Sequence, residues 1–314
     1  MVHSVSADLA ATLFAQVYAG AEPILAVERI PRAYNYEVWR VDTITGHYTL
    51  KIAHADMEPA RIVNVMAALR LATDAGVPCP RLLAYAPDTQ IGRAVLVHEW
   101  IAGDDAETVW SHMSRDEQAR FAFAFGRAIA AMHSVTGPSF SEDAALTRPM
   151  VSWHAGLYDY LNEHAVGMRQ LHLLPLATLE TLVDYLRQAI TGLSPTIRPA
   201  LTHWDLWLAN TIVDAGRFVG VIDWDSAAFS DPVADFVRLE VWLFTPYPES
   251  RTPFWAGYSE MQSIDHDHEA RLDVYQGLEY FAEVYRTTAR NDLTLAAHFR
   301  ERLKQWMIAH AISA

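Results

Sequence analysis

The first third of the chain alternates apolar and polar residues in short runs, which is the pattern of β-strands. Residues 36–41 (YEVWRV) and 48–52 (YTLKI) are two such runs, and the polar connection between them ends at Gly46. We therefore expect a hairpin there. Residues 93–101 (RAVLVHEWI) predict another strand with a buried middle, and the preceding GVPCPRLLAY predicts a loop that leads into a strand.

Apolar residues three and four positions apart predict helices over most of the remaining chain. Pro59 suits the first turn of one of these helices, and Ser114 with Glu117 fits a capping box at the start of another. The predicted helices cover residues 6–19, 58–75, 114–135, 153–165 and 176–191, and most of the chain from residue 232 onwards. Strands return only where TIVD and RFVGVIDW form a second predicted hairpin.

These patterns divide the chain near residues 100–104. We predict an α+β fold of two lobes, a small strand-rich lobe over residues 1–101 and a large, mostly helical lobe over residues 102–314. A length of 314 residues with 51% hydrophobic residues is sufficient for the cores of such a two-lobed enzyme.

Charge and cysteine content limit the classes of binding partner and the cellular compartments that we expect for the protein. The formal net charge of −14 argues against nucleic-acid binding, which requires basic patches. A single cysteine suits a reducing cytoplasm. The N-terminus lacks a basic region and reads as an amphipathic helix rather than a signal peptide, and no uncharged apolar run is long enough to cross a membrane. We expect a cytoplasmic protein without nucleic-acid or membrane partners.

Polar side chains interrupt the apolar sequence at LTHWDLWLANTIVD, residues 201–214, and again at VIDWD, residues 221–225. Asn210 precedes one strand of the predicted hairpin and Asp223 follows the other, so both can reach one place. Their carboxamide and carboxylate oxygens suit Mg²⁺. Asp205 is then left to orient a hydroxyl and accept its proton, as phosphoryl transfer requires. Asp and Asn also cap turns, but this spacing favours a site.

Lys51 is the basic residue of the predicted strand 48–52. Leu50 and Ile52 share one face of that strand, and Lys51 lies on the opposite face. An isolated strand lysine is usually solvated. Lys51 follows a predicted hairpin, precedes a predicted helix and lies upstream of Asp205. This place makes it the candidate ligand of the α- and β-phosphates of a nucleotide that donates the phosphoryl group. The chain has no G-x-x-x-x-G-K-[ST], which excludes a P-loop NTPase.

The motifs HWDLWLAN and VIDWD resemble those of the aminoglycoside phosphotransferase family in the eukaryotic-like kinase superfamily, whose usual pattern is H-G-D-x-x-x-x-N followed by I-D-[FW]-[DE]. The resemblance implies a bilobal, protein-kinase-like fold and ATP or GTP as donor. It implies Asp205 as catalytic base, Asn210 and Asp223 as Mg²⁺ ligands, and His203 as the residue that orients the loop. The DLW within the motif is also similar to fructosamine kinases.

Three further residues are compared with the family pattern. Trp204 replaces its glycine, a bulky departure that affects the acceptor side of the loop. Asp225 matches a frequent acidic position without a defined role. Asp235 in DPVADF matches an Asp that usually supports the catalytic loop.

The resemblance also locates the nucleotide. The segment PRAYNYEVW stands where the family carries its nucleotide-positioning loop, and it retains Asn35 but has no glycine. Glu58 is the candidate partner of Lys51, although it lies closer in sequence than is usual. GVPCPRLL and LVHEWIAG resemble the approach to the hinge and the hinge itself, so backbone groups of Glu99 and Ile101 are expected to bind adenine.

The acceptor site is expected in the C-terminal part of the chain. Trp204, Trp207, Asp225 and Trp242 are candidate acceptor-binding residues, although aromatic residues in a helical domain also fill cores. Residues 258–283 contain seven acids and one arginine. They predict either a wall that attracts a cationic acceptor or a solvated helix face.

The resulting hypothesis is a Mg²⁺-dependent phosphotransferase acting on a hydroxyl of a small molecule, foremost an antibiotic, so that it confers resistance. The alternative on the same fold is a metabolic kinase for homoserine, choline-like or fructosamine-type acceptors. An alternative of another class is a catalytically silent, nucleotide-binding pseudokinase, which the bulky Trp204 and the doubtful partner of Lys51 would favour.

Overall fold

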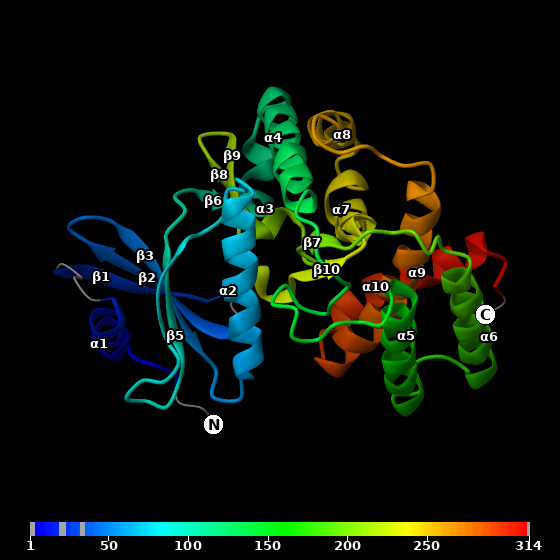
Figure 1. Ribbon diagram of the computed structural model, residues 1–314, viewed down its shortest axis with the longest axis horizontal. Coiled ribbons are helices and arrows are strands. Elements are labelled where there is room, and N and C mark those ends of the chain that lie inside the picture. Colours follow the sequence, from blue (N-terminus) through cyan, green and yellow to red (C-terminus); the bar gives the residue numbers. More distant parts are fainter. Residues whose placement is uncertain (1–3, 19–22, 32–34, 313–314) are drawn as a thin grey trace.

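The structure, a computed structural model, describes residues 4–18, 23–31 and 35–312. An antiparallel sheet forms the N-terminal region, and helices form most of the C-terminal part. Figure 1 shows the sheet at one end, most of the helices at the other, and helix α2 (Pro59–Asp74) between them. The predicted α+β, kinase-like fold class is thereby confirmed.

The elements follow the predicted order with a few additions. The remaining helices are α1 (Ala7–Val17), α3 (Ala106–Val109), α4 (Arg115–His133), α5 (Trp153–Gln170), α6 (Leu176–Thr191), α7 (Phe236–Leu239), α8 (Arg251–Tyr258), α9 (His268–Ala289) and α10 (Leu293–Ala309). The strands are β1 (Ile24–Ile30), β2 (Tyr36–Thr43), β3 (His47–Ala53), β4 (Leu82–Ala86), β5 (Val95–Glu99), β6 (Asp104–Asp105), β7 (Ala200–Thr202), β8 (Thr211–Asp214), β9 (Arg217–Val221) and β10 (Ala228–Ser230).

The five-stranded sheet has the order β1-β2-β3-β5-β4, and all neighbouring strands are antiparallel. Leu50 and Ile52 of β3 are fully buried against the core that includes Leu13 and Phe14 of α1. On the opposite face, Ile62 of α2 packs with residues of β2 and β5. The predicted alternation of β3 is confirmed, and it directs Lys51 away from the α1 side.

Helix ends follow the expected local chemistry. Ser114 and Glu117 form the predicted capping box at the start of α4, with reciprocal side-chain and backbone hydrogen bonds. Pro59 occupies the first turn of α2. Helix α5 runs five residues beyond the predicted end at residue 165. Residue 19, the predicted end of the first helix, lies outside the described residues.

The strands next to His203, Asn210 and Asp223 lie in the C-terminal part. β8 and β9 form the second predicted hairpin, closed by Ala215 and Gly216 with φ of 47° and 72°. Such left-handed turn residues match the twist of a two-residue hairpin loop. β6 adds a third strand to this hairpin, and β7 pairs with β10 beside it.

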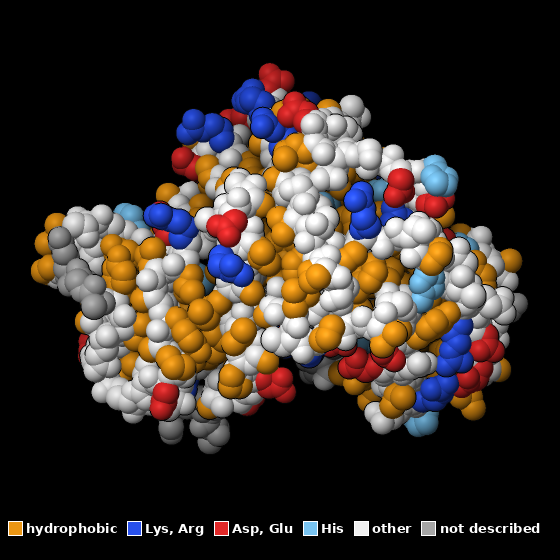
Figure 2. All heavy atoms as spheres, viewed as in Figure 1, with side chains coloured by type: hydrophobic (Ala, Val, Ile, Leu, Met, Phe, Trp, Pro, Cys, Tyr) orange, Lys and Arg blue, Asp and Glu red, His pale blue; other side chains and the backbone are white. Residues whose placement is uncertain are grey.

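The surface is mixed in charge. On the face drawn in Figure 2, Lys and Arg side chains lie beside Asp and Glu side chains rather than gathering in one basic patch. No helix in the described ranges combines the length and the apolarity needed to cross a membrane.

Candidate active site

Residues 203–210 connect β7 to β8 and are called the catalytic loop below. Asp235 holds the start of this loop. The Asp235 carboxylate accepts hydrogen bonds from the backbone N–H of His203 at 2.9 Å and of Trp204 at 2.6 Å. It also contacts His133 Nε2 at 3.1 Å. Asp235 is 1% exposed, so these contacts are shielded from water. This geometry gives Asp235 the supporting place that the resemblance implied.

Trp204 adopts a left-handed backbone conformation with φ of 64°. Glycine takes this conformation without steric cost, whereas a residue with a Cβ is strained there. The structure therefore gives a physical reason for the glycine of the usual motif. The Trp204 side chain is held by a hydrogen bond from Nε1 to Ser230 Oγ at 3.1 Å, and its ring lies 6.2 Å from that of Trp153.

We expect Trp204→Gly to be more stable than Trp204→Ala. Both variants lose the indole packing, but only alanine keeps the left-handed strain. The free energy of unfolding should be about 1 kcal/mol higher for glycine, the reverse of the usual order in regular structure. Urea denaturation of the two variants measures the difference. A glycine variant less stable than the alanine variant would contradict the strain assignment.

His203 joins the catalytic loop to the segment before Asp223. Its Nε2 lies 3.0 Å from the Ile222 carbonyl and therefore donates, while Nδ1 accepts from the Asp205 N–H at 3.3 Å. These partners select the neutral tautomer with the proton on Nε2. The ring is fully buried. His203 thus touches no solvent and acts, in this geometry, by fixing the positions of its neighbours.

Asp205 presents a partly exposed carboxylate. Asn210 Nδ2 donates to the Asp205 carbonyl at 2.9 Å and to Oδ2 at 2.8 Å, which fixes the side chain. Oδ1 faces Arg238 Nε at 3.5 Å, and 30% of the Asp205 side chain is accessible. The Asn210 amide and the Arg238 guanidinium both orient this carboxylate, and its accessible part can face the hydroxyl of a substrate. Sequence reasoning missed Arg238, because no motif marks it.

The residues proposed for Mg²⁺ leave oxygen atoms available. Both N–H groups of Asn210 are directed at Asp205, and Oδ1 accepts no hydrogen bond from the residues that the structure describes. Partial desolvation raises the pKa of the Asp223 carboxyl, repulsion from Asp225 and Asp205 raises it further, and Lys51 opposes the rise. Asp223 therefore lies among other carboxylates, where a divalent ion would be stabilising.

This donor set fits Mg²⁺ rather than a metal held by protein alone. Within the described ranges, no three His, Cys, Asp or Glu side chains are arranged around a common metal position. Mg²⁺ characteristically uses one or two carboxylates together with water and substrate phosphates. The Asn210 amide oxygen and the Asp223 carboxylate match that mode.

Lys51 points to the same place from the sheet. Its Nζ lies 3.9 Å from Asp223 Oδ1 and 5.1 Å from the centre of the Tyr36 ring. The expected pair with Glu58 does not form. Glu58 is the exposed N-cap residue of α2 and makes no ion pair within the described residues. The pairing failed because Glu58 precedes the helix, and the residues facing the site come from later turns.

The nucleotide-side predictions have mixed outcomes. Asn35 Nδ2 donates to Asp225 Oδ2 at 2.8 Å, so Asn35 contacts the segment after Asp223. Residues 32–34 of the expected nucleotide loop lie outside the described residues. The Glu99 N–H is engaged by Arg81 O at 2.9 Å and is not available to adenine. The Ile101 N–H donates to no acceptor in the part of the chain that the structure describes.

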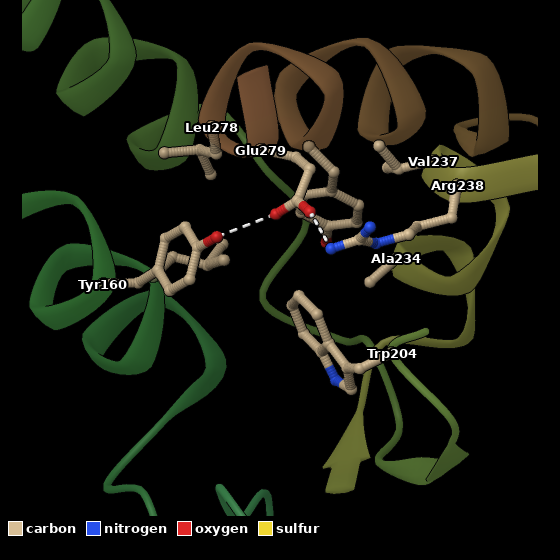
Figure 3. Close-up of a pocket in the computed structure, with 9 residues that line it drawn as sticks. Tyr160, Trp204, Ala234, Val237, Arg238, Leu278 and Glu279 are labelled. Atoms are coloured by element: carbon tan, nitrogen blue, oxygen red, sulfur yellow. Dashed lines mark hydrogen bonds and ion pairs between the residues drawn. The ribbon is translucent and has the colours of Figure 1, made fainter. Parts of the chain in front are cut away.

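A cavity of about 20 Å³ lies beside Trp204 and Arg238 (Figure 3). Trp204 forms one of its walls, and Tyr160 with Glu279 forms another. Trp207 and Trp242 lie outside this cavity, with ring centres 5.9 Å apart. Trp242 stacks on His298 instead. The four candidate acceptor residues are therefore divided among three places: Trp204 lines the cavity, Trp207 lies with Trp242 outside it, and Asp225 lies beside Asn35.

The acidic segment 258–283 does not form a free acidic wall. Glu279 pairs with Arg238 at 3.1 Å and with Arg286 at 2.8 Å, and Glu283 pairs with the same two arginines. Most of the other acids of the segment also have an arginine or histidine partner: Glu260 with Arg127, Asp265 with Arg271, Asp267 with His266 and Asp273 with His310. These pairs reduce the attraction that the segment exerts on a cationic acceptor.

We expect Glu279→Gln to destabilise the protein most at neutral pH. Burial alone would raise the pKa of Glu279, but Arg286 and Arg238 outweigh it and lower the pKa to about 2. The ionised form therefore contributes stability above pH 4.5, which is lost as the pH falls towards 2. Burial raises the pKa of Glu283, so the pH dependence from this residue has the opposite sign: its contribution to stability increases as the pH falls.

The variant should lose about 3 kcal/mol of unfolding free energy at neutral pH, because two arginines lose a buried partner. The difference from wild type should narrow as the pH falls from 5 to 2. Urea denaturation across that range measures it. A difference independent of pH would exclude the ion-pair explanation.

The comparisons with known proteins identify the family. Residues 26–275 match the model of the phosphotransferase enzyme family APH. Since the match spans most of the chain, the protein belongs to this family. The matched region extends from the sheet through the catalytic loop and into α9. No curated protein matches the chain in sequence.

Solved structures share the fold at low identity. A thermostable mutant of aminoglycoside phosphotransferase APH(4)-Ia, in ternary complex with ADP and hygromycin B, has a TM-score of 0.74 and 14% identity, covering 98% of this chain and 100% of its own. The GDP complex of aminoglycoside 2'-phosphotransferase-IIIa has a TM-score of 0.67 and 15% identity, covering 98% and 100%. A candidate fructosamine-3-kinase from Thermobifida fusca has a TM-score of 0.66 and 19% identity, covering 96% and 100%.

Proposed function

We propose that the protein transfers the γ-phosphate of ATP or GTP to a hydroxyl group of a small molecule in the cytoplasm. The observation that carries this proposal is the convergence of Lys51 from the sheet, Asp205 and Asn210 from the catalytic loop, and Asp223 from the segment after β9. Together they supply a phosphate ligand, candidate Mg²⁺ ligands and a base. We assign residues 1–101 to nucleotide binding and residues 102–314 to catalysis and acceptor binding.

In this mechanism, positioning and charge neutralisation carry most of the catalysis. Lys51 binds the donor phosphates, and the Ile101 N–H with the Glu99 carbonyl contacts the base. Mg²⁺, held by Asn210 and Asp223, would neutralise phosphate charge when bound. Asp205 orients the acceptor hydroxyl and accepts its proton as the oxygen attacks the phosphorus. His203 and Asp235 keep Asp205 in place.

The first candidate acceptor is an antibiotic hydroxyl, with resistance as the consequence. The structural neighbour in complex with hygromycin B supports this candidate. The similarity in fold does not itself define the acceptor, since one fold serves many substrates.

The second candidate is a hydroxyl metabolite, such as homoserine, a choline-like compound or a fructosamine. The ion-paired state of Glu279 and Glu283 favours it over a polycationic antibiotic, because no free carboxylate of that pair remains to bind ammonium groups. The fold of the candidate fructosamine-3-kinase is a further support. A pseudokinase is disfavoured because the base, the amide and the carboxylate are all present.

We expect Asp223→Asn to weaken the contribution of Mg²⁺ to nucleotide binding. In the wild type, Mg²⁺ should tighten the binding of ATP or GTP, and the variant should lose about tenfold or more of that gain because a metal ligand has lost its charge. Isothermal titration calorimetry with Mg²⁺ and with EDTA measures the gain. Asp184→Asn, an exposed change on α6, is the control. An unchanged gain would remove Asp223 from the metal site.

The proposed function is tested by release of ADP or GDP in the presence of Mg²⁺ and a panel of acceptors. The panel contains aminoglycosides, cyclic-peptide and macrolide antibiotics, choline, homoserine and fructosamines. Acceptor-dependent release on an antibiotic supports the first candidate, and release on a metabolite alone supports the second. Nucleotide binding without turnover on any acceptor would favour the pseudokinase.

A further inference from the structure

Helix α2 contacts the C-terminal part through a buried asparagine. Asn64 lies on the face of α2 turned away from solvent and is 5% exposed. Its Nδ2 donates to the carbonyls of Asp225 at 3.2 Å and Ala227 at 3.0 Å, and its Oδ1 accepts from the Ala144 N–H at 2.7 Å. The Asn64 side chain thus forms hydrogen bonds through its amide nitrogen and its amide oxygen, and all of the partners are backbone groups of the C-terminal part.

These contacts concern the segment that carries Asp223. Asp225 and Ala227 follow it by two and four residues, within and just after the single turn of 3-10 helix at Trp224–Ser226. Asp223 itself has a left-handed backbone with φ of 66°, a conformation that surrounding contacts must maintain. Asn64 supplies two of those contacts, and Asn35 holds the Asp225 side chain from the same side.

The helix has no carboxylate in the place where we expected one. Glu58 is exposed at its N-cap, and the acid that ends the helix, Asp74, lies sixteen positions further along. The polar link from α2 to the site is therefore a neutral side chain that acts on the backbone of the metal-binding segment, not an anion that acts on Lys51.

We propose that Asn64 is a positioning residue for Asp223, through which the placement of α2 determines how well the protein binds Mg²⁺ together with nucleotide. The inference rests on the proposed function, because it concerns the same nucleotide site. Asn64 does not touch the nucleotide or the metal. It holds the Asp225–Ala227 backbone so that the Asp223 carboxylate faces Lys51 and the Asn210 oxygen.

Asn64→Asp is the sharpest variant. It keeps the size of the side chain and the acceptor for Ala144, but replaces the donor to Asp225 and Ala227 with an oxygen. Asn64→Ala removes all three contacts, and it replaces Asn64→Asp in the test if that variant does not fold. Asn162→Asp is the matched control, since Asn162 is an exposed residue of α5 that accepts a hydrogen bond from Arg187.

The measurement is the dissociation constant of ATP or GTP by calorimetry, with Mg²⁺ and with EDTA, together with the melting temperature. The ratio of the two constants reports the Mg²⁺ gain. Loss of one or two hydrogen bonds corresponds to about a tenfold change in such a ratio. We expect Asn64→Asp to lower the gain by that amount and to leave the EDTA constant unchanged, while Asn162→Asp keeps the wild-type values.

Two outcomes overturn the proposal in distinguishable ways. If either Asn64 variant melts at a lower temperature but keeps the wild-type Mg²⁺ gain, Asn64 is only a structural residue and the proposed function is unaffected. If the wild type itself shows no Mg²⁺-dependent nucleotide binding, the proposed function fails, and this inference fails with it.

Discussion

We expect Asp205→Asn to lower the turnover number by about 10³-fold, the range typical of the removal of a general base. Asparagine has the same shape and can still accept the hydrogen bond from Asn210, so the loop should keep its conformation. It cannot accept the proton of the acceptor hydroxyl. Because Asp205 is not a proposed nucleotide ligand, the affinity for Mg²⁺-nucleotide should remain that of the wild type.

The measurement is steady-state kinetics on any acceptor that supports turnover, with calorimetric nucleotide binding beside it. Asp214→Asn is the control, because Asp214 is an exposed carboxylate on β8 with only a 3.9 Å contact to Arg217. A variant at Asp205 that retains turnover would exclude it as the base. A variant that loses nucleotide binding as well would show that the change disturbs the whole site.

Lys51→Met should lower kcat/KM by about 10² to 10³-fold, as expected for the loss of one preorganised charge on the transferring group. Methionine keeps an unbranched side chain that is one heavy atom shorter, so most of the packing beside Tyr36 should remain. In the variant, Asp223 loses the cation that opposes its raised pKa. We therefore also expect weaker nucleotide binding with Mg²⁺ present, which separates this variant from Asp205→Asn.

The chain offers a clean control for this change, since its only lysines are Lys51 and Lys304. Lys304 is exposed on α10, far along the chain from the sheet. Lys304→Met should leave the kinetics unchanged. If Lys51→Met changes kcat/KM by less than about threefold, well below the effect of a lost electrostatic contact, Lys51 is a surface lysine despite its position.

Local patterns predicted most elements of the fold, and the exceptions have physical causes. β1 was missed because its residues do not alternate cleanly between buried and exposed, and its strand conformation comes from pairing with β2. Helix α5 continues beyond the predicted end because Gly167 lies against the ring of Tyr285, where a Cβ would come within 2.4 Å of it. Tertiary packing therefore accounts for a glycine inside this helix.

The site was predictable where its residues are close in sequence. The spacing of Asp205, Asn210 and Asp223 placed them at one end of a hairpin, and strand alternation directed Lys51 towards them. Their chemical roles stay predictions. Asn64 could not be identified in this way, since 161 residues separate it from Asp225.

Charge patterns were the least informative part of the sequence. The acids of segment 258–283 read equally well as a wall for a cationic acceptor or as a solvated face. The structure pairs most of them with arginine or histidine, including residues such as Arg238 and Arg127 that lie far away in sequence. Net charge along a segment does not reveal which carboxylates remain free.

The central claim is that the protein transfers a phosphoryl group from a nucleotide to the hydroxyl of a small molecule, with Asp205 as the base that accepts the proton of that hydroxyl. The most direct test is mass spectrometry of the acceptor after incubation with γ-¹⁸O-labelled ATP or GTP and Mg²⁺, using wild type and Asp205→Asn in parallel. The account predicts a labelled phosphate ester with wild type and almost none with the variant. Label found only in free phosphate, or equal ester formation by the two proteins, would contradict it.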